Sequence, residues 1–499
     1  MKIAPPYRDY IIQIVCYLYI LLFVYAAVNK IMDFQNFRVQ IAQSPLLTSF
    51  AGFVAVAVLA IEIAIALLLS IPQLRKLGLY AALTLMILFS LYIYMILTYS
   101  PFVPCSCGGI LEDMGWTQHL LFNIAFCILA VSAIYLLDNG TAKSRYYTAI
   151  KIVCLTIASS GFMAVLYLLS EHSVHHQNNF VRRYPPFPAK RIKAQELGFE
   201  SYYFAGISAG KIYLGNSSAP ALVTVFDTTL AKVETFRIGI KDTLHDFHNV
   251  QLRVVPPNFY LFDGTVPCVF SGNLTERKAV LKIDKVPGFT KAEVIDSNYL
   301  LIRTLSPKKE HLLMKINMNN PQDRISNEKL LEKQQDGIFD TDGTFNFDPA
   351  SDKLAYIYYY RNQYIVADRN LKLLSRPHTI DTTSHAKIKT EYVAKRKQRK
   401  FSAPPFMVNR ITALHKNLLF VNSTLPGKYD SEKMWKNANV VDVYDIRDSS
   451  YLLSFYVYKV DGGQINSIMV DDNFLYVLIG TNIVLYKLHT TLKRHFTST

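Results

Sequence analysis

The first third of the chain consists of long apolar runs separated by short polar connections. Five runs are long enough to cross a bilayer as helices, which takes roughly 20 apolar residues each. They cover residues 10–28, 46–71, 77–99, 119–137 and 147–170. The first run is too long for the core of a signal peptide, and four more follow it, so we expect it to be retained. The pattern predicts a membrane bundle of five spanning helices over residues 1–170.

Beyond residue 170 the pattern changes to short runs of β-branched and aromatic residues. Six of them stand at residues 211–216, 258–264, 297–304, 353–360, 416–423 and 473–481. Their spacing, roughly 40 to 65 residues, is in the range of propeller blades. We expect residues 198–499 to form an all-β soluble domain, a six-bladed β-propeller, with a pair of β-sandwiches as the alternative. Residues 199–204 are expected to close the ring against the C-terminal strands, which removes exposed sheet edges.

A segment rich in proline and basic residues, residues 171–197, separates the two parts. Pro185, Pro186 and Pro188 favour an extended spacer. The most basic stretch, residues 387–400, falls inside the β domain and is expected in a long loop between blades. That loop either binds an anionic partner or is simply solvated.

The net charge of +15 comes from 53 Lys and Arg against 38 Asp and Glu. Most of the excess lies in the soluble part, and it suggests acidic partners or anionic lipid headgroups. Nucleic acid is not the expected partner, because a membrane anchor dominates the first third of the chain.

Basic residues in the short connections predict the orientation of the spans. Three clusters, within residues 2–8, 75–76 and 143–145, fall on the same side, which should be the cytoplasm. The connection at residues 100–118 contains no Lys or Arg and should face outward. Five spans then place the soluble domain outside as well. Lys30 and Arg38 are two positive charges on the predicted outer side, close to Asp33.

The outward connection contains a Cys-x-Cys pair, Cys105 and Cys107. Outside the cytoplasm, disulfides form and persist. A ring closed between cysteines one residue apart is tight, and strained, exposed disulfides are the labile, oxidising ones. The pair is therefore either a reactive disulfide or a structural staple.

Four further residues of the same region are candidates for the site. Glu112, Asp113 and Trp116 follow the cysteines, and Trp116 is expected at the membrane interface. His119, at the start of the fourth span, either acts as acid or base in thiol exchange or is a polar residue that caps the helix.

Glu62 is the one carboxylate inside a predicted span. Burying a carboxylate in a membrane is expensive, so it should pair with a partner or relay protons. Counted along the helices, it lies too deep to meet Asn29 or Lys30 at the outer end of the first span.

The soluble part contains no Ser-His-Asp order, no metal-ligand spacing and no Gly-rich phosphate loop. Cys268 is its only cysteine and is expected to be a packing residue. Nothing in this part specifies a catalyst.

The membrane part resembles the MauE/DoxX-like redox-associated membrane proteins. The resemblance rests on residues 29–47, on the span with Glu62 and, most specifically, on PCSCGGILEDMGWTQHLLFN at residues 104–123. It implies a role in disulfide formation or thiol–electron transfer outside the membrane, with Cys105 and Cys107 matching the motif's cysteines. MauE is associated with maturing a disulfide-rich periplasmic subunit in methylamine utilisation. The soluble part resembles six-bladed propellers of periplasmic proteins in Bacteroidota.

Together these observations predict a bacterial inner-membrane protein with a cytoplasmic N-terminus and a periplasmic propeller. Cys105 and Cys107, assisted by His119, would exchange disulfides with a periplasmic thiol protein, and a quinone is the candidate cofactor. The chain would then be a thiol–disulfide oxidoreductase whose propeller holds the client. The alternative is a non-catalytic scaffold subunit of a cell-envelope complex, in which the cysteine pair is structural.

Overall fold

The computed structural model describes residues 5–43, 51–99, 115–138, 142–172, 179–240, 246–266, 268–393 and 398–497. The chain forms two compact units. The first comprises Met1–His176 together with Ile388–Pro405, and the second comprises Gln177–Lys387 together with Phe406–Thr499. Within the described ranges the first unit is helical apart from one hairpin, and the second is built mainly of strands.

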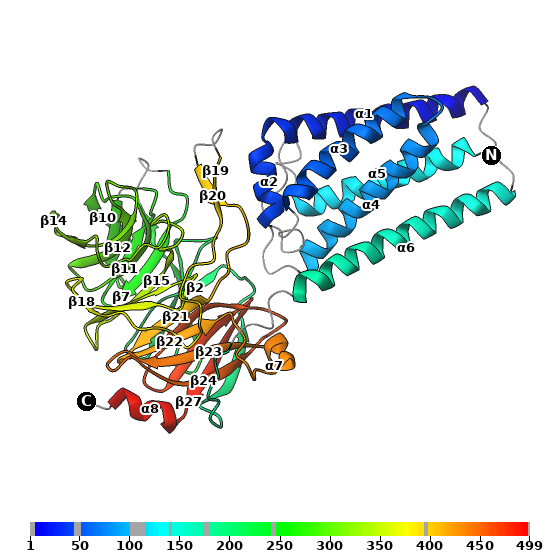
Figure 1. Cartoon of the computed structure of the whole chain (residues 1–499). Coiled ribbons are helices and arrows are strands. Elements are labelled where there is room, and N and C mark those ends of the chain that lie inside the picture. The colour runs from blue at the N-terminus through cyan, green and yellow to red at the C-terminus, as the bar shows by residue number, and fades with distance from the viewer. Residues whose placement is uncertain are drawn as a thin grey trace. The chain divides into compact units, whose positions relative to one another are not determined.

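The first unit contains the five apolar helices that the sequence predicts (Figure 1). In the described residues, the stretches able to cross a bilayer are Tyr7–Met32, Gly52–Ser70, Arg75–Thr98, Trp116–Leu137 and Lys143–Leu166. They lie in α1 (Pro5–Met32), α3 (Ala51–Ser70), α4 (Arg75–Tyr99), α5 (Trp116–Leu137) and α6 (Ala142–His172). A further short helix, α2 (Phe34–Gln43), lies in the connection between the first two spans. In lipid only a helix satisfies every backbone group within one segment, which is why runs of this length become helices.

The core of the bundle combines aromatic and small side chains. Tyr19 and Phe23 of α1 are fully buried, as are Ala130 and Ala133 of α5. Small residues allow membrane helices to approach closely. Gly78 shows this at the α3–α4 corner, because a Cβ there would lie 2.8 Å from the Leu69 side chain. The outer faces expose large apolar residues, as expected for surfaces in contact with lipid.

The second unit is a six-bladed β-propeller in the described residues, which confirms the expected fold (Figure 1). Each blade is an antiparallel sheet of four strands, and β6 (Gly239–Ile240) adds a short parallel strand to blade 2. Blade 1 contains β2 (Tyr202–Ser208), β3 (Lys211–Asn216), β4 (Leu222–Asp227) and β5 (Lys232–Arg237); blade 2 contains β7 (Gln251–Val255), β8 (Asn258–Phe262), β9 (Cys268–Asn273) and β10 (Lys278–Asp284); blade 3 contains β11 (Phe289–Val294), β12 (Tyr299–Leu305), β13 (His311–Asn317) and β14 (Asn320–Asn327).

The remaining three blades follow the same plan. Blade 4 contains β15 (Gly343–Asp348), β16 (Lys353–Tyr358), β17 (Tyr364–Asp368) and β18 (Leu373–Ser375); blade 5 contains β21 (Asn409–His415), β22 (Leu418–Ser423), β23 (Ala438–Asp445) and β24 (Ser450–Tyr458); blade 6 contains β25 (Ile465–Val470), β26 (Phe474–Ile479), β27 (Asn482–Leu488) and β1 (Ala189–Glu196). The short helices are α7 (Glu432–Asn437) and α8 (Thr490–Thr497). The basic stretch expected in a loop contains the hairpin of β19 (Thr390–Val393) and β20 (Gln398–Phe401), which belongs to the first unit.

The ring is closed by strands from both ends of the domain. β1 pairs antiparallel with β27, from Ala189 opposite Leu488 to Glu196 opposite Asn482. The prediction that residues 199–204 close the ring is wrong, since β2 begins in that segment and is the first strand of blade 1. β1 carries no clear hydrophobic signal, because the outermost strand of a blade is largely exposed and polar residues protect its edge. Its residues lie in the segment that the sequence analysis read as a spacer.

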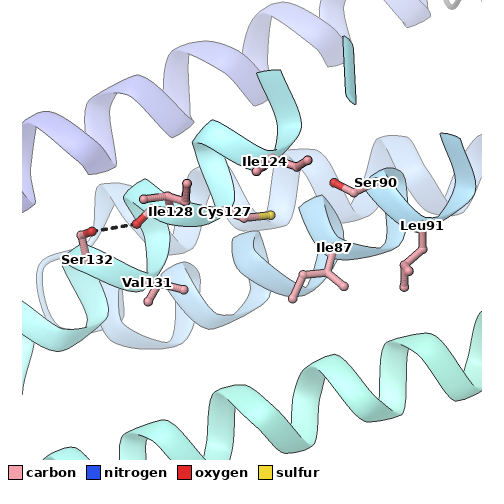
Figure 2. A pocket seen from close by; sticks show the side chains of 8 residues that line it. All are labelled: Ile87, Ser90, Leu91, Ile124, Cys127, Ile128, Val131 and Ser132. Carbon is pink, nitrogen blue, oxygen red and sulfur yellow. Dashed lines mark hydrogen bonds between the residues drawn. The ribbon is translucent and has the colours of Figure 1, made fainter. Parts of the chain in front are cut away.

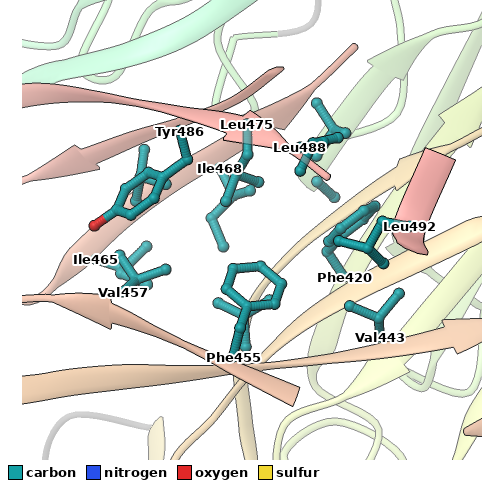
Figure 3. Close-up of a cluster of buried hydrophobic side chains, with 14 of the residues drawn as sticks. Phe420, Val443, Phe455, Val457, Ile465, Ile468, Leu475, Tyr486, Leu488 and Leu492 are labelled. Atoms are coloured by element: carbon teal, nitrogen blue, oxygen red, sulfur yellow. The ribbon is translucent and has the colours of Figure 1, made fainter. Parts of the chain in front are cut away.

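Separate hydrophobic cores fill the spaces between adjacent blades. Figure 3 shows the core between blades 5 and 6, where Phe420 and Phe455 face Ile468 and Tyr486. Leu492 of α8 also packs into this core. The innermost strands of neighbouring blades contact one another in a closed cycle, β2–β7–β11–β15–β21–β25. This cycle surrounds a central channel.

Candidate functional site

The proposed redox residues fall on both sides of a gap in the described chain. Cys105, Cys107, Glu112 and Asp113 lie outside the described residues. The chain resumes at residue 115, and α5 begins with Trp116. The part of the site that the structure describes therefore lies in the helices that flank this segment.

His119 lies in the first turn of α5 and does not cap the helix. The cap is made by Gln118, whose Oε1 accepts a hydrogen bond from the Gly115 N–H at 3.1 Å. The His119 ring stands 6.4 Å from the Trp116 ring and is partly buried. Within the described residues its Nδ1 atom has no hydrogen-bond partner. The imidazole is therefore available for chemistry and is not used for helix capping.

Glu62 forms an ion pair with Lys30 across the interface of α1 and α3. The carboxylate side chain is 1% exposed, and Lys30 is 13% exposed. The expectation that Glu62 lies too deep to meet Lys30 is therefore wrong. That estimate counted backbone depth alone, whereas the long lysine stem carries its ammonium group several ångströms along the helix surface.

Aromatic rings surround the ammonium group of Lys30. Its Nζ atom lies 5.4 Å from the centre of the Phe37 ring and 5.7 Å from that of Phe89. Lys30 is also within electrostatic range of His119. The Tyr19 hydroxyl of α1 donates a hydrogen bond of 2.6 Å to the carbonyl oxygen of Phe126 in α5.

We call Lys30, Glu62, His119 and Asn123 the polar cluster of the bundle. Asn123 follows His119 by one helical turn, so both lie on the same face of α5, and its side chain is 3% exposed. Within the described residues, Glu62 Oε2 and Asn123 Nδ2 have no partner, like His119 Nδ1. Unpaired buried polar atoms are costly, so this cluster is suited to bind a polar group. The cluster supplies both donors and acceptors, and a proton carrier.

A groove of about 340 Å³ lies between α4 and α5. Figure 2 shows its lining, which is mostly apolar. The Ser132 hydroxyl donates a hydrogen bond of 2.8 Å to the carbonyl oxygen of Ile128. Ser90 likewise donates to the carbonyl oxygen of Met86. The lining residues are Ile87, Ser90, Leu91, Ile124, Cys127, Ile128, Val131 and Ser132.

Two members of the polar cluster, Asn123 and Lys30, were not predicted as partners in the site. Asn123 could have been noticed as an amide inside a predicted span, one turn after His119. Lys30 was noticed but was not paired with Glu62. Four cysteines in the described residues are in no disulfide, namely Cys16, Cys127, Cys154 and Cys268.

Comparison with protein families confirms the resemblance of the N-terminal helices. The model of the family described as methylamine utilisation protein MauE matches residues 8–136. The matched segment contains the whole polar cluster and the Cys-x-Cys pair, and it ends before α6. A search of curated proteins found no match.

Several solved structures are similar to this chain at low sequence identity. A member of the DUF4221 family from Bacteroides vulgatus is 13% identical, with a TM-score of 0.40; the match covers 60% of this chain and 97% of that one. A putative exported protein from Bacteroides fragilis is 9% identical, with a TM-score of 0.36, over 64% and 98% of the two chains. An inactive virginiamycin B lyase from Staphylococcus aureus is 9% identical, with a TM-score of 0.34, over 60% and 99%.

Proposed function

We propose that this protein exchanges thiols and disulfides with a client on the outer side of the bacterial cytoplasmic membrane. The observation that carries the proposal is the match of residues 8–136 to the MauE family, because that segment includes the outward Cys-x-Cys pair. The five spanning helices support a membrane location. The basic clusters support an orientation with the N-terminus inside and the propeller in the periplasm.

The exchange conserves electrons and protons. A client thiolate attacks one sulfur of the Cys105–Cys107 disulfide, and the other sulfur leaves as a thiolate. A second client thiolate then resolves the mixed disulfide. Two electrons pass to the cysteine pair, which ends as two thiols, and the client gains one disulfide. The two protons of the client thiols end on the pair.

His119 is suited to carry one of these protons. It follows the cysteine segment directly, and an imidazole can both accept and release a proton near neutral pH. Because Gln118 makes the helix cap, His119 is free to act in this way. Its protonation would be influenced by the neighbouring charge of Lys30.

The polar cluster and the groove fit a quinone. Asn123 Nδ2 is a buried donor without a partner in the described residues, and a quinone headgroup offers carbonyl acceptors. The groove between α4 and α5, which no residue of the polar cluster lines, has the apolar lining that an isoprenoid chain requires. When bound, a quinone would supply an acceptor for two electrons and two protons. Lys30, His119 and Asn123 are the residues that would hold its headgroup.

Trapping of a mixed disulfide tests the proposal. In a Cys107→Ser or Cys105→Ser variant the remaining thiolate should attack the disulfide of an oxidised client and expel one client thiolate. The resulting adduct should accumulate until reducing agent releases it, because the second cysteine is missing, and Cys268→Ser serves as the control. His119→Gln should still trap the client, but with an altered pH dependence of the rate. Full function of the double Cys105→Ser/Cys107→Ser variant would contradict thiol exchange.

The second candidate function is a scaffold for a cell-envelope complex. The propeller favours it, because its six blades form the larger part of the chain and propellers commonly present binding surfaces. Purification from membranes with stoichiometric partners, unchanged in the double serine variant, would support this function over thiol exchange.

A further inference from the structure

The central channel of the propeller contains a cavity of about 240 Å³. Residues from the innermost strands of all six blades line it, from β2 and β7 through β11, β15 and β21 to β25. The wall is tight where blades 1 and 2 meet, because a Cβ on Gly206 would lie 2.2 Å from the carbonyl oxygen of Val254. The cavity is thus formed mainly by the innermost strands, and Tyr359, in the turn between β16 and β17, also lines it.

Positive charge predominates in this cavity. Arg253, Lys291 and Arg410 line it, against a single acidic residue, Glu293. Glu293 is already paired, since its Oε2 lies 3.3 Å from Arg253 Nε. Among the described residues, no carboxylate forms an ion pair with Lys291 or Arg410.

A second ion pair near the cavity leaves this imbalance unchanged. Arg303 Nη1 lies 2.7 Å from Asp342 Oδ1 and also donates to the carbonyl oxygen of Gly343. Arg303 and Asp342 thus compensate each other, as do Arg253 and Glu293. Lys291 and Arg410 therefore remain without an ion pair among the described residues, in a partly enclosed space.

The ammonium group of Lys291 contacts two neutral groups. It donates to the Thr344 hydroxyl and lies 5.9 Å from the centre of the Phe345 ring. Burial and the nearby charges of Arg253 and Arg303 lower the pKa of Lys291 to about 8. A buried cation is costly when it is not compensated, so an anion in the cavity would relieve that cost.

We propose that the central channel binds a small anion through a carboxylate or phosphate group placed between Lys291 and Arg410. A cavity of about 240 Å³ suits a small dicarboxylate or a small phosphate compound. The planar guanidinium of Arg410 can bind such a group with two parallel hydrogen bonds. The proposal is independent of the thiol chemistry of the membrane domain.

Calorimetric titration of the full chain in detergent tests the site, with inorganic phosphate and succinate as separate probes at constant ionic strength. We expect saturable binding of at least one of them with one site per chain. Arg410→Gln and Lys291→Met should each weaken that binding by about tenfold or more, since each removes a charge-assisted hydrogen bond. Arg369→Gln is the matched control, because it removes a positive charge from the outer surface of blade 4.

The outcomes separate a site from general electrostatic attraction. Unchanged thermal unfolding midpoints would show that Arg410→Gln and Lys291→Met remain folded. If Lys291→Met lowers the unfolding midpoint, the test of the anion site rests on Arg410→Gln alone. Arg410 forms no described ion pair, so its replacement should not destabilise the fold. Absence of saturable binding of both anions, or equal weakening by Arg369→Gln, would overturn the proposal.

Discussion

At the scale of single residues, Arg182 shows how one buried charge can fix a segment of chain. Its guanidinium binds both carboxylate oxygens of Asp442, at 2.8 and 3.2 Å, and donates to the Ser423 hydroxyl at 2.8 Å. It also pairs with Asp430, and its side chain is fully buried. Phe180, two residues earlier, packs on Val408 and Leu425. The segment that precedes β1 is thereby anchored to blade 5.

Replacing Arg182 by Met should destabilise the propeller by about 3–5 kcal/mol, because two buried carboxylates would lose their countercharge. Urea unfolding can be followed through Trp435, which lies 5.7 Å from this guanidinium, in a Trp116→Phe background. Arg183→Met is the control, since the Arg183 side chain is exposed and should cost at most about 1 kcal/mol. Equal effects of the two changes would contradict this role of Arg182.

Lys291 makes the proposed anion site dependent on pH. Its pKa of about 8 means that the side chain is charged near pH 7 and loses its charge as the pH rises. The charged groups around it are Arg253, Arg303, Glu293 and Asp342. Succinate is fully ionised above about pH 7, so only the protein titrates.

We therefore expect the affinity for succinate to fall between pH 7 and pH 9, by up to about tenfold for each unit above the lysine pKa. Titration calorimetry at fixed ionic strength measures this change. The Lys291→Met variant should bind weakly and with the same affinity at every pH in the range. A wild-type affinity that rises with pH would contradict a charged Lys291 in the site.

At the scale of helices and strands, the sequence predicted the elements whose side chains are buried. The inner strands of each blade are packed on both faces, so they read as continuous apolar runs, such as residues 353–358. β1 was missed because it presents mainly polar residues, and polar patterns do not distinguish a strand from a loop. α2 was missed because its ten residues, half of them polar, are too few to be read as a spanning helix. The ion pair of Lys30 and Glu62 was missed because side-chain reach is not visible in sequence spacing.

β1 is the element on which closure of the propeller depends. Replacing residues 189–196 by an equally long Gly/Ser segment should leave the edge of β27 unpaired. An exposed strand edge is a template for pairing with other chains, so we expect aggregation and a lower unfolding midpoint. Size-exclusion chromatography and a thermal melt measure the two effects.

The matched control replaces Leu373–Ser375, which is β18, by Gly-Ser-Gly. This strand is also the outermost of its blade, but it joins neighbours that are consecutive in sequence. Its loss should cost less, because it does not connect the two ends of the ring. If both replacements had the same effect, closure by β1 would not be the special feature of blade 6.

At the scale of the whole molecule, the proposed function depends on which side of the membrane each part faces. Arg75 and Lys76 begin α4, directly after the connection from α3, and this end of the two helices should be cytoplasmic. The connection with Cys105 and Cys107 carries no basic residue and should face outward. Because five helices span the membrane, the propeller should share its side with the cysteine pair.

Single-cysteine reporters test this orientation in a background that lacks the six native cysteines. Gln73→Cys places a thiol in the α3–α4 connection, where the side chain is exposed. Tyr429→Cys places one on the propeller, at a position that is 75% exposed. A third variant keeps only Cys105 and Cys107 and is reduced mildly before labelling. A membrane-impermeant maleimide is then applied to intact spheroplasts and, separately, to lysed ones.

We expect labelling of the cysteine pair and of the propeller reporter in intact spheroplasts, and labelling of the Gln73 reporter only after lysis. The positive charges of Lys30 and Arg38 in the first connection oppose this orientation, but Lys30 is neutralised by Glu62, so its weight in the charge balance is reduced. The reverse pattern would invert every span and place the cysteine pair in the reducing cytoplasm. Thiol exchange with a periplasmic client would then be ruled out, whereas the anion site in the propeller would stand.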